Sequence, residues 1–286
     1  MPDVSIIIIN YNTFQLACAC IQSVIEQTKE VSYEIILVDN ASVESDPSLF
    51  IEKFPDVNLI VSEKNLGFAG GNNLGLQHAN AEYILLLNSD TILIENSVLL
   101  SLQKFKSLNN IGFLGVKSVY PDGRVQDTCS RLPTIKNIFS DLFFLHQIFP
   151  HVKQYYRLDR NFYPDAVWGC FMLFKKDLLA RFKEKKLNDT FFMYCEDLLW
   201  CWEARKINLK NYYYAETKII HLNKGSQNNE ETSEKMNSLL MENKRKLKII
   251  INGKIGILFY DLLSKILYYR SKLTKRTGAV LKTLFF

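Results

Sequence analysis

Short apolar runs alternate with longer segments that can form amphipathic helices along the first half of the chain. The apolar runs occupy residues 4–9, 34–39, 58–62, 83–87 and 112–116. The segments that can hold helices include 14–29, 70–80 and 95–108. The runs are apolar throughout and do not alternate with polar residues, which is typical of strands covered on both faces. This order predicts an α/β fold with a mostly parallel central sheet flanked by helices.

The pattern becomes irregular beyond this region and then recovers. Residues 120–166 contain a turn-like YPDG and many aromatic residues, but no clear periodicity. Regular sequence returns at AVWGCFMLF (166–174), at FFMYCEDLLWCWEARK (191–206), whose second half predicts a helix, and at a strand that ends in His221. The polar residues 224–234 predict a loop.

The C-terminal part of the chain is basic. Residues 242–286 contain 11 Lys or Arg against two acidic residues, whereas the other 241 residues contain 24 basic and 28 acidic ones. A basic region attached to a mildly acidic body indicates an anionic partner surface, either membrane lipid or nucleic acid. Because no recognised nucleic-acid-binding module accompanies it, we expect no nucleic-acid partner.

Residues 226–286 are expected to form a basic, amphipathic helical extension to a domain at residues 1–225. On a helical wheel one narrow face is charged and the rest is largely apolar. The charged face contains Lys254, Asp261, Lys265 and Lys272. Such a helix can lie on a membrane, dock on the domain or form an oligomer with a second subunit, and the sequence leaves these alternatives open. The flanking basic residues favour the cytoplasmic leaflet of a membrane.

Cysteine usage and the N-terminus bear on the cellular compartment. The six cysteines are irregularly spaced, unlike those of a disulfide-rich secreted protein, and Cys18 and Cys20 suit core packing better than metal binding. Met1 is followed by an apolar strand without a basic n-region, and no uncharged apolar run is long enough to cross a membrane. We expect a cytoplasmic protein with reduced thiols, either free or peripheral at the inner face of the cell membrane.

Polar residues follow two of the predicted strands at the point where each strand ends. The first strand runs into Asn10, Tyr11 and Asn12, a turn without the glycines that a dinucleotide site requires, so NAD and FAD are disfavoured. The second strand ends in Asp39 and Asn40, which can accept from a ribose hydroxyl or a base N–H, or can simply stabilise a turn. Ligands of open α/β sheets bind beyond the carboxyl ends of strands, so the position suits a ligand, but both interpretations remain open.

The segment NLGFAGGNNLGL at 65–76 has four glycines in twelve residues. Glycine allows the backbone to come close to a ligand or to a neighbouring element. The position of the segment before the strand at 83–87, together with the pair Asn72 and Asn73, favours contact with a nucleoside over a turn that merely opens a helix.

The apolar strand at 83–87 delivers a carboxylate at its end, in the sequence Asn88-Ser89-Asp90. An extended backbone can aim the side chains of Asn88 and Asp90 at one cation, and Mg²⁺ or Mn²⁺ accepts such oxygens together with phosphate and water. Asn and Asp are also frequent in turns, so the preceding strand gives the pattern its weight. His221 closes another strand, where a neutral imidazole can complete a metal site, contact a phosphate or serve structure alone.

Two adjacent carboxylates, Glu196 and Asp197, stand at the start of a predicted helix. Adjacent residues there point to different faces, so one acid can cap or pair structurally while the other faces a cleft as a general base. The alternative is a first-turn acidic pair that complements the helix dipole. The pair alone leaves both interpretations open.

In this order, the motifs resemble family-2 glycosyltransferases of the GT-A fold, especially bacterial rhamnosyltransferase-like members. The matching segments are VSIIIINYNT, EIILVDNAS, NLGFAGGNNLG, YILLLNSDT, VWGCFMLFKKDLL and FFMYCEDLLWCWEARK, with the strand to His221. The resemblance implies a catalytic domain at residues 1–225 and a nucleotide-diphosphate sugar, such as dTDP-rhamnose, as donor. It implies an inverting transfer to a hydroxyl of a glycan or lipid-linked glycan, in cell-surface polysaccharide synthesis. Other sugars remain open.

The resemblance also implies roles for single residues. Asp90 corresponds to the metal-binding carboxylate of the family's D-x-D motif, with Asn88 at its first position. Asp197 corresponds to the catalytic base, with Glu196 beside it, and His221 to a histidine that contacts metal or phosphate. The donor-binding residues are expected to be Asn10, Tyr11, Asn12, Asp39, Asn40, Asn65, Gly67, Asn72, Asn73, Asn88 and Ser89. The acceptor side is expected at Trp168, Gly169, Cys170 and the 120–166 region.

The catalytic assignment has one weak point in the sequence. The family pattern ED-x-D-L reads EDLLW here, so Leu199 stands where a second acidic residue is usual. This departure leaves open a catalytically silent, sugar-nucleotide-binding or scaffold protein of the same fold. For an active enzyme, an exposed aspartate has a pKa of about 3.9, which predicts that Asp197 is ionised at neutral pH.

Overall fold

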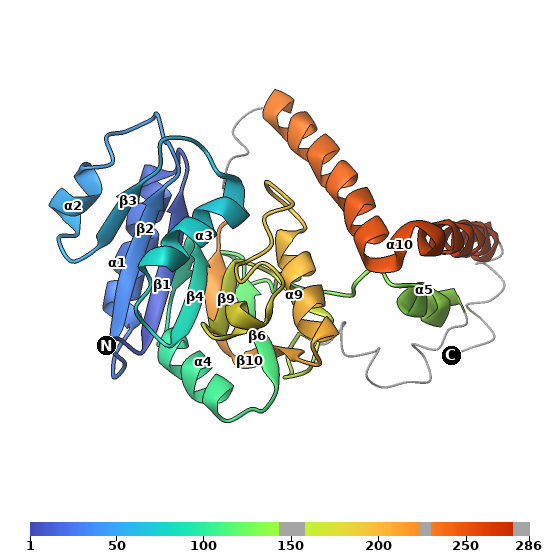
Figure 1. Cartoon of the computed structure of the whole chain (residues 1–286), viewed down its shortest axis with the longest axis horizontal. Coiled ribbons are helices and arrows are strands. Elements are labelled where there is room, and N and C mark those ends of the chain that lie inside the picture. Colours follow the sequence, from blue (N-terminus) through green and yellow to red (C-terminus); the bar gives the residue numbers. More distant parts are fainter. Residues whose placement is uncertain (143–157, 224–229, 277–286) are drawn as a thin grey trace.

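The computed structural model describes residues 1–142, 158–223 and 230–276. Within these residues an eight-stranded sheet forms the centre of the molecule, in the order β3-β2-β1-β4-β9-β6-β10-β5 (Figure 1). Its strands are β1 Val4–Asn10, β2 Tyr33–Asp39, β3 Asn58–Val61, β4 Tyr83–Asn88, β5 Thr91–Leu93, β6 Ile111–Val119, β9 Phe171–Lys175 and β10 Lys210–His221. A separate two-stranded sheet joins β7 Cys129–Ser130 to β8 Ala166–Val167.

Most of the large sheet is parallel. Strands β3, β2, β1 and β4 run in one direction, and β6 and β10 are parallel to each other. Strand β9 lies antiparallel between β4 and β6, and β5 pairs antiparallel with β10. The predicted α/β fold with a mostly parallel sheet is therefore confirmed.

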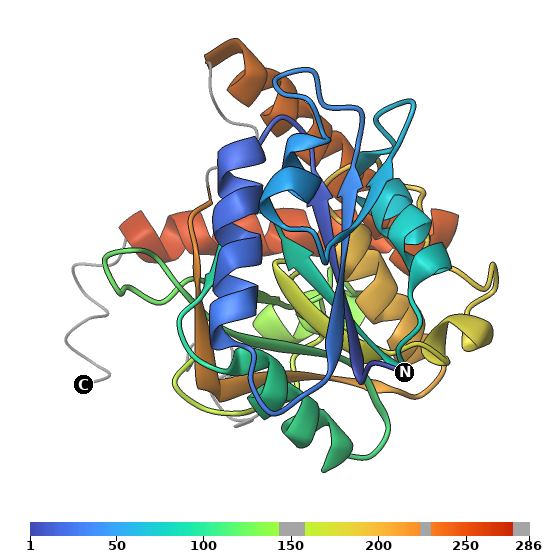
Figure 2. The ribbon, with the colours of Figure 1, turned by 90° about the vertical axis from the view of Figure 1, so that its left-hand side faces the viewer.

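Helices cover both faces of this sheet. Their bounds are α1 Phe14–Gln27, α2 Leu49–Lys53, α3 Gly67–His78, α4 Ser97–Lys106, α5 Ile135–Leu142, α8 Leu178–Arg181, α9 Glu196–Lys206 and α10 Glu230–Arg276. Helix α1 lies on one side of β1 and α3 on the other (Figure 2). The helices predicted at 14–29, 70–80 and 95–108 are present as α1, α3 and α4, with ends that differ by a few residues.

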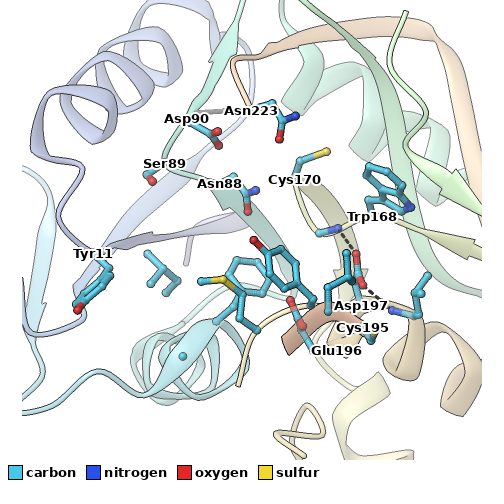
Figure 3. Close-up of a pocket in the computed structure, with 18 of the residues that line it drawn as sticks. Tyr11, Asn88, Ser89, Asp90, Trp168, Cys170, Cys195, Glu196, Asp197 and Asn223 are labelled. Carbon is cyan, nitrogen blue, oxygen red and sulfur yellow. Dashed lines mark hydrogen bonds between the residues drawn. The ribbon is translucent and has the colours of Figure 1, made fainter. Parts of the chain in front are cut away.

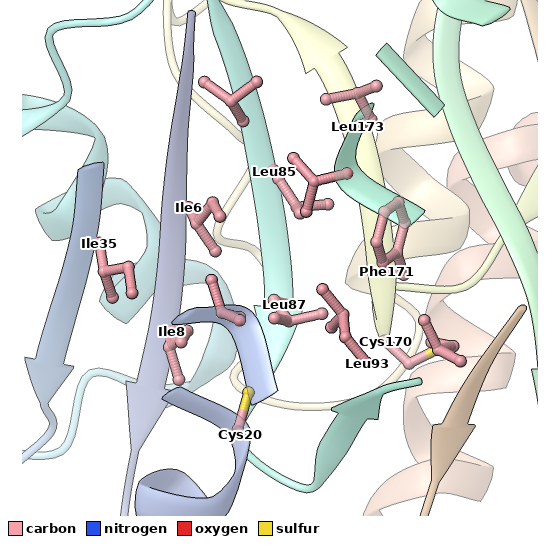
Figure 4. Packing of buried hydrophobic residues seen from close by; sticks show 14 of the residues in the cluster. Ile6, Ile8, Cys20, Ile35, Leu85, Leu87, Leu93, Cys170, Phe171 and Leu173 are labelled. Carbon is pink, nitrogen blue, oxygen red and sulfur yellow. The ribbon is translucent and has the colours of Figure 1, made fainter. Parts of the chain in front are cut away.

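The sheet divides the hydrophobic core into two layers. Ile6 and Ile8 of β1 pack on one face with Leu85 and Leu87 of β4 (Figure 4). Ile7 belongs to the cluster on the opposite face, and all three isoleucines are fully buried. Because successive side chains of a strand point to opposite faces, a strand covered on both sides needs apolar residues at every position. The unbroken apolar runs follow from this requirement.

A connection at Trp168–Cys170 interrupts the predicted segment 166–174 and separates β8 from β9. The antiparallel pairing of β9 with β4 puts the beginning of β9 beside the end of β4. The Cys170 carbonyl accepts a hydrogen bond of 3.2 Å from the Asn88 N–H. The connection therefore lies next to the turn at Asn88, which the sequence associated with a cation.

The C-terminal helix α10 consists of two segments. Gly253 interrupts it with φ 72° and ψ 171°, a left-handed conformation that favours glycine. The first segment packs on the start of α9 through the buried Leu247, and the second packs on α5. The two segments run in different directions (Figure 1). Among the helices that the structure describes, we find none with the length and apolar character needed to cross a bilayer.

The loop predicted at residues 224–234 is only partly observable. Residues 224–229 lie outside the described part of the chain. Residues 230–234 belong to α10, so the prediction of a loop is wrong there. Polar residues are compatible with the beginning of a helix, because its first four N–H groups have no intrahelical partner and can be satisfied by polar side chains or water.

Candidate active site

A cavity of about 530 Å³ opens beyond the carboxyl ends of β1, β4 and β10 (Figure 3). Thirteen of the predicted site residues line it. They are Tyr11, Asn40, Asn65, Gly67, Asn88, Ser89, Asp90, Trp168, Gly169, Cys170, Glu196, Asp197 and His221. Asp90 comes from the turn after β4, whereas Asp197 comes from the first turn of α9. The fold thus brings the two carboxylates of the predicted mechanism into one cavity.

Asp197 is held by backbone N–H groups. Its Oδ2 accepts a hydrogen bond of 3.1 Å from Gly169, and its Oδ1 accepts one of 2.8 Å from Leu198 (Figure 3). Burial raises the pKa of Asp197 above its ordinary value, although both N–H groups act in the opposite direction. Burial therefore places the pKa of Asp197 above that of an exposed aspartate, and its ionisation at neutral pH stays a prediction.

Glu196 lines the same cavity as its neighbour. Its Oε2 atom is buried and has no hydrogen-bond partner among the described residues. Burial and the negative charge of Asp197 raise the pKa of Glu196 well above its ordinary value. We expected only one of the two acids to face a cleft, but the cavity wraps around the beginning of α9 and includes both.

The backbone before α9 is unusual. Tyr194 and Cys195 have φ of 67° and 74°, in the left-handed region that residues with a Cβ rarely adopt. The Phe192 carbonyl accepts a hydrogen bond of 2.8 Å from the Phe68 N–H. A Cβ on Gly67 would lie 2.2 Å from that carbonyl oxygen, and Gly67 itself has φ 71°. A glycine is therefore required where the start of α3 meets the loop that carries the acidic pair.

Asp90 and His221 form a polar pair at one end of the cavity. Nε2 of His221 lies 3.2 Å from Oδ1 of Asp90, and its Nδ1 lies 3.0 Å from Oε1 of Gln126. Gln126 also donates to the His221 carbonyl over 2.6 Å, so the imidazole ring is fixed. Gln126 was not predicted, because it lies in the irregular region 120–166.

The residues around Asp90 suit a divalent cation. Oδ1 of Asn88 is buried without a hydrogen-bond partner among the described residues, and this side chain lines the cavity beside Ser89 and Asp90. Amide and carboxylate oxygens, with an imidazole nitrogen from His221, are ligands that Mg²⁺ and Mn²⁺ accept. In the part of the chain that the structure describes, no three His, Cys, Asp or Glu side chains gather into a metal-binding group. A cation here would need further ligands from phosphate and water.

Asn40 after β2 and Asn65 before α3 are joined by a hydrogen bond. Asn40 donates to Asn65 Oδ1 over 3.0 Å and to the Gly67 carbonyl over 3.1 Å. Asn65 Oδ1 also accepts a hydrogen bond of 2.9 Å from the Gly67 N–H. Tyr11 is 39% exposed and lies across the cavity from Asp197 (Figure 3). Tyr11, Asn40, Asn65 and Gly67 thus all line the cavity.

Asn10, Asn12 and Asp39 do not line the cavity. Asn10 donates to Oδ2 of Asp39 over 2.7 Å, and both side chains are buried. Asn12 accepts a hydrogen bond of 2.8 Å from Val43 N–H. In this structure the three side chains brace the loops after β1 and β2, and a contact between any of them and a nucleoside stays a prediction.

Asn72 and Asn73 also lie outside the cavity. Asn73 exchanges hydrogen bonds of 2.8 and 3.0 Å with the backbone of Leu187, which ties α3 to the loop after α8. Asn72 donates to the Phe68 carbonyl over 2.9 Å, and its buried Oδ1 has no hydrogen-bond partner among the described residues. Donor contacts of this pair likewise stay predictions.

The residues predicted on the acceptor side, Trp168, Gly169 and Cys170, also line the cavity. Trp168 is 39% exposed, and its Nε1 donates to Ser130 Oγ over 2.7 Å. Burial, with the charges of Asp90 and Asp197, raises the pKa of the Cys170 thiol to about 12. A thiol in that state is a poor nucleophile, so Cys170 serves packing and shape instead of covalent chemistry.

Several residues that line the cavity were not predicted as site residues. Thr13, Met193 and Tyr194 lie inside matched motifs and Ser130 lies in the irregular region 120–166, but none of the four was singled out as a site residue. Leu240 and Lys244 come from α10, in the region interpreted as a basic extension. Only long-range packing brings α10 to the cavity, so local sequence patterns could not indicate its contribution.

The fold and the carboxylates at the ends of its strands define a GT-A-like protein, and solved structures share this fold. One is the mannosyltransferase PcManGT from Pyrobaculum calidifontis in complex with GDP-Man and Mn²⁺, with a TM-score of 0.61 and 16% identity, covering 98% of this chain and 76% of that one. Another is TarS 1–349 of S. aureus, with a TM-score of 0.54 and 17% identity, covering 96% and 73%. The predicted GT-A fold is confirmed.

The family follows from the sequence itself. The family described as Glycosyl transferase family 2 matches residues 5–182, which is more than half of the chain. The chain therefore belongs to glycosyl transferase family 2, as the motifs predicted. The rhamnosyltransferase-like specificity is not confirmed by this match.

Curated relatives agree with the family. The hexosyltransferase Agl10 of low-salt glycan biosynthesis in Haloferax volcanii is 26% identical over 73% of this chain and 64% of its own length. The UDP-Glc:alpha-D-GlcNAc-diphosphoundecaprenol beta-1,3-glucosyltransferase WfgD of Escherichia coli is 34% identical over 39% of this chain and 44% of its own length. The uncharacterized protein y4gI of Sinorhizobium fredii is matched over 26% of its length. The chain thus spans less than two thirds of each of these relatives.

Proposed function

We propose that this protein transfers a sugar from a nucleotide-diphosphate donor to a hydroxyl group of a glycan or lipid-linked glycan acceptor. The observation that carries the proposal is that Asp90 and Asp197 line one cavity, which Tyr11 and Asn40 also line, with Tyr11 across it from Asp197. A carboxylate at one end can bind the leaving group through a cation, while the other can accept a proton. Membership in glycosyl transferase family 2 supports the same reaction class.

The proposed reaction is a single displacement with inversion. The acceptor oxygen attacks the anomeric carbon from the face opposite the diphosphate. The bond between that carbon and the β-phosphate oxygen breaks, and the nucleoside diphosphate leaves with the bonding electrons. The proton of the acceptor hydroxyl passes to the carboxylate of Asp197, which lies near the acceptor-side residues Trp168 and Gly169.

The environment of Asp197 suits a general base. A base is most effective when its pKa lies nearer the working pH than that of an ordinary carboxylate. Burial moves the pKa of Asp197 in this direction, while the N–H groups of Gly169 and Leu198 keep the carboxylate oriented. We assign Glu196, which lacks a partner for Oε2 among the described residues, to the binding of a donor or acceptor hydroxyl.

A divalent cation fits the proposal. Asp90, His221 and Asn88 would hold Mg²⁺ or Mn²⁺, and the cation would stabilise the charge on the leaving diphosphate. PcManGT of the same fold was solved with GDP-Man and Mn²⁺, which supports the choice of ion. For the chain itself, the buried and unbonded Oδ1 of Asn88 is the clearest sign that a ligand completes this site.

The acceptor class is supported by the names of relatives. Agl10 is a hexosyltransferase of glycan biosynthesis, and the acceptor named for WfgD is a sugar linked to a diphosphoundecaprenol lipid. We therefore propose a role in cell-surface glycan synthesis at the cytoplasmic side of the membrane. Rhamnose is the favoured sugar from the sequence motifs, and other hexoses are alternatives that a donor panel separates.

The competing hypothesis is a catalytically silent GT-A-like protein that binds sugar nucleotides or acts as a scaffold. Leu199, at the departure from the family motif, is buried at 1% exposure in a cluster with Phe191 and Leu247. This position serves packing, so the lost acid is no direct argument against catalysis. Donor hydrolysis and transfer should be measured for a panel of nucleotide sugars with Mn²⁺ and with EDTA. Binding of a donor without turnover of any donor would favour the silent protein.

We further propose that residues 1–225 form the catalytic domain and that 226–286 extend it towards an anionic membrane. The second segment of α10 uses one face, with the buried Leu263, to pack against the domain. Its outward face is apolar and spaced as one helical face. The outward residues and their exposed fractions are Ile255 86%, Leu258 70%, Phe259 50%, Leu262 54%, Ile266 45% and Tyr269 64%. Exposed Lys254 and Lys265 border this face, which suits the headgroups of an anionic lipid surface.

Vesicle binding tests the membrane proposal. The full chain is expected to sediment with phosphatidylglycerol vesicles and much less with phosphatidylcholine vesicles. Combined Ile255→Ser, Leu262→Ser and Ile266→Ser substitutions should abolish sedimentation, whereas Met241→Ser on the first segment should not. Absence of sedimentation in the unsubstituted chain would contradict the proposal. Dimerisation that the same triple substitution removes would assign the face to a second copy of the chain instead.

A further inference from the structure

The cavity contains one unexplained cationic side chain, Lys244 of α10. Among the described residues that line the cavity, it is the one Lys or Arg. The same lining contains the carboxylates of Asp90, Glu196 and Asp197. A cavity with three carboxylates repels an anionic substrate unless cations compensate, and Asp90 alone is placed to do so through a metal.

Lys244 is available to bind a ligand. Its side chain forms no hydrogen bond or ion pair with any residue of the described part of the chain. By contrast, Lys246 on the same helix turn forms an ion pair of 2.7 Å with Glu242. A lysine that lines a cavity without a protein partner is suited to an anionic group of a ligand.

The part of α10 that contains Lys244 is hydrogen-bonded to the loop at residues 192–195, which precedes Glu196 and is called the catalytic loop below. The neighbouring Asn243 is 3% exposed, and its Nδ2 donates to the Met193 carbonyl over 2.8 Å and to the Tyr194 carbonyl over 3.4 Å. Leu247, one turn further, is 1% exposed in a cluster with Cys195. These contacts hold the first segment of α10 against the strained residues that precede Glu196.

We propose that Lys244 binds a phosphate group of a substrate, and that the first segment of α10 is thereby part of the active site. The proposal rests on the proposed function, because it assumes a phosphate-bearing ligand in this cavity. Lysine is a compact point charge on a flexible stem, so it can follow a phosphate during binding and departure. Two sources of phosphate are possible in this reaction: the diphosphate of the donor and the phosphate of a lipid-linked acceptor.

Binding of nucleoside diphosphates tests the donor source. UDP, GDP and dTDP should be titrated calorimetrically with Mn²⁺ into the full chain and into Lys244→Met, Lys244→Arg and Lys246→Met variants. If Lys244 contacts the donor diphosphate, Lys244→Met should weaken binding roughly ten- to hundredfold, since hydrogen bonds to charged groups carry energies of that order. Lys244→Arg should retain most of the affinity, and Lys246→Met should match the unsubstituted chain.

Steady-state kinetics test the acceptor source. If Lys244 contacts a phosphate of the acceptor, nucleoside diphosphate binding should stay unchanged in Lys244→Met while KM for the phosphate-bearing acceptor rises about tenfold or more. A chain that binds nucleoside diphosphates normally, with unchanged KM for both substrates in Lys244→Met, would overturn the assignment of Lys244 and leave the proposed function standing. An unsubstituted chain that binds none of the three nucleoside diphosphates and transfers no sugar would overturn both.

Discussion

The carboxylate of Asp197 and the backbone N–H of Gly169 are joined by a hydrogen bond of 3.1 Å. This bond connects the beginning of α9 with the turn between β8 and β9, two segments that are adjacent only in the folded protein. The N–H group favours the ionised carboxylate and burial favours the protonated one, and burial dominates because the pKa of Asp197 is raised. The bond therefore fixes the orientation of the Asp197 carboxylate, while burial raises the pKa of Asp197 and so increases its basicity.

Replacement of this base should reduce turnover with little effect on donor binding. We expect Asp197→Asn to lower kcat by roughly 10²–10⁴-fold, the usual contribution of a general base. The amide retains the shape of the side chain but cannot accept the proton. Steady-state kinetics with the identified donor and acceptor provide the measurement, and calorimetry provides donor affinity. The exposed Asp177→Asn substitution serves as control, and an Asp197→Asn enzyme of normal kcat would remove the assignment.

Glu196 should make the stability of the protein depend on pH. Its pKa is near 4.5 when it is free and is raised well above this value in the folded protein. Between the two values the folded state holds a proton that the unfolded state has lost, so the free energy of unfolding falls as the pH rises through this window. Glu196→Gln should remove much of this decline and should be more stable than the unsubstituted protein above the window.

Denaturant unfolding at a series of pH values measures this effect. Asp197 adds a decline of the same sign, so some pH dependence should remain in Glu196→Gln. The exposed Glu184→Gln substitution should follow the unsubstituted curve. If the free energy of unfolding changes with pH in the same way for Glu196→Gln and the unsubstituted protein, folding does not raise the pKa of Glu196.

Gly67 should be sensitive to the smallest substitution. In Gly67→Ala the new Cβ would meet the Phe192 carbonyl oxygen at 2.2 Å and would also occupy a left-handed conformation with φ 71°. Gly123 has φ 84° but nothing within 4 Å of a built Cβ, so Gly123→Ala isolates the conformational penalty. We expect a loss of about 1 kcal/mol for Gly123→Ala and several times this for Gly67→Ala, measured by denaturant unfolding. Equal losses of unfolding free energy in the two variants would mean that the loop before α9 moves away from the new Cβ at little cost.

Asp90 should determine the response to metal. Mn²⁺ is expected to raise the thermal midpoint of the protein in the presence of a nucleoside diphosphate, and EDTA should reverse this and abolish transfer. In Asp90→Asn the stabilisation by Mn²⁺ should largely disappear, because the amide is neutral and a weaker ligand. A thermal shift assay with the unsubstituted protein and with Asp122→Asn, an exposed acid in the turn after β6, provides the comparison. Equal Mn²⁺ stabilisation in Asp90→Asn would place the cation elsewhere.

Asn243 should act as a positioning residue. Asn243→Ala leaves the Met193 and Tyr194 carbonyls without their donor, which should cost about 1–3 kcal/mol of stability and should reduce kcat. Asn252 on the same helix makes a comparable bond of 2.8 Å to the Pro133 carbonyl. Asn252→Ala should therefore lose similar stability but retain kcat. If the two variants lose activity equally, α10 contributes stability alone and does not position the catalytic loop.

The sequence predicted much of the fold because strands such as β1 and β4 are short, apolar through their centres and bounded by turns. Ile6, Ile7 and Ile8 are all buried because the sheet is covered on both faces. A strand covered in this way needs consecutive apolar residues, and such a run is visible in the local sequence. The antiparallel insertion of β9 between β4 and β6 was not predicted. Its residues have the same apolar character in either direction, so only pairing with distant strands decides their orientation.

The site was predictable in part for the same reason. Asp90 and Asp197 stand next to recognisable elements, so local sequence marked both as candidates, and the family resemblance implied their roles. Lys244 and Gln126 were not, because a lysine in a basic helix and a glutamine in an irregular segment look the same whether or not packing brings them to a cavity or to one of its lining residues. Lys244 reaches the cavity through the packing of α10. Gln126 contacts His221 because its segment lies beside the end of β10.

By itself the sequence determined the alternation of buried strands and helices, the polar residues at strand ends and the family to which the chain belongs. These properties are local, because they depend on the hydrophobicity of neighbouring residues and on the turns that follow them. The tertiary structure alone decided which polar residues share a cavity, how far burial raises the pKa of Glu196 and Asp197, and that the C-terminal helix forms part of the wall. Distances and desolvation arise only when segments far apart in the chain pack together, so no local pattern can record them.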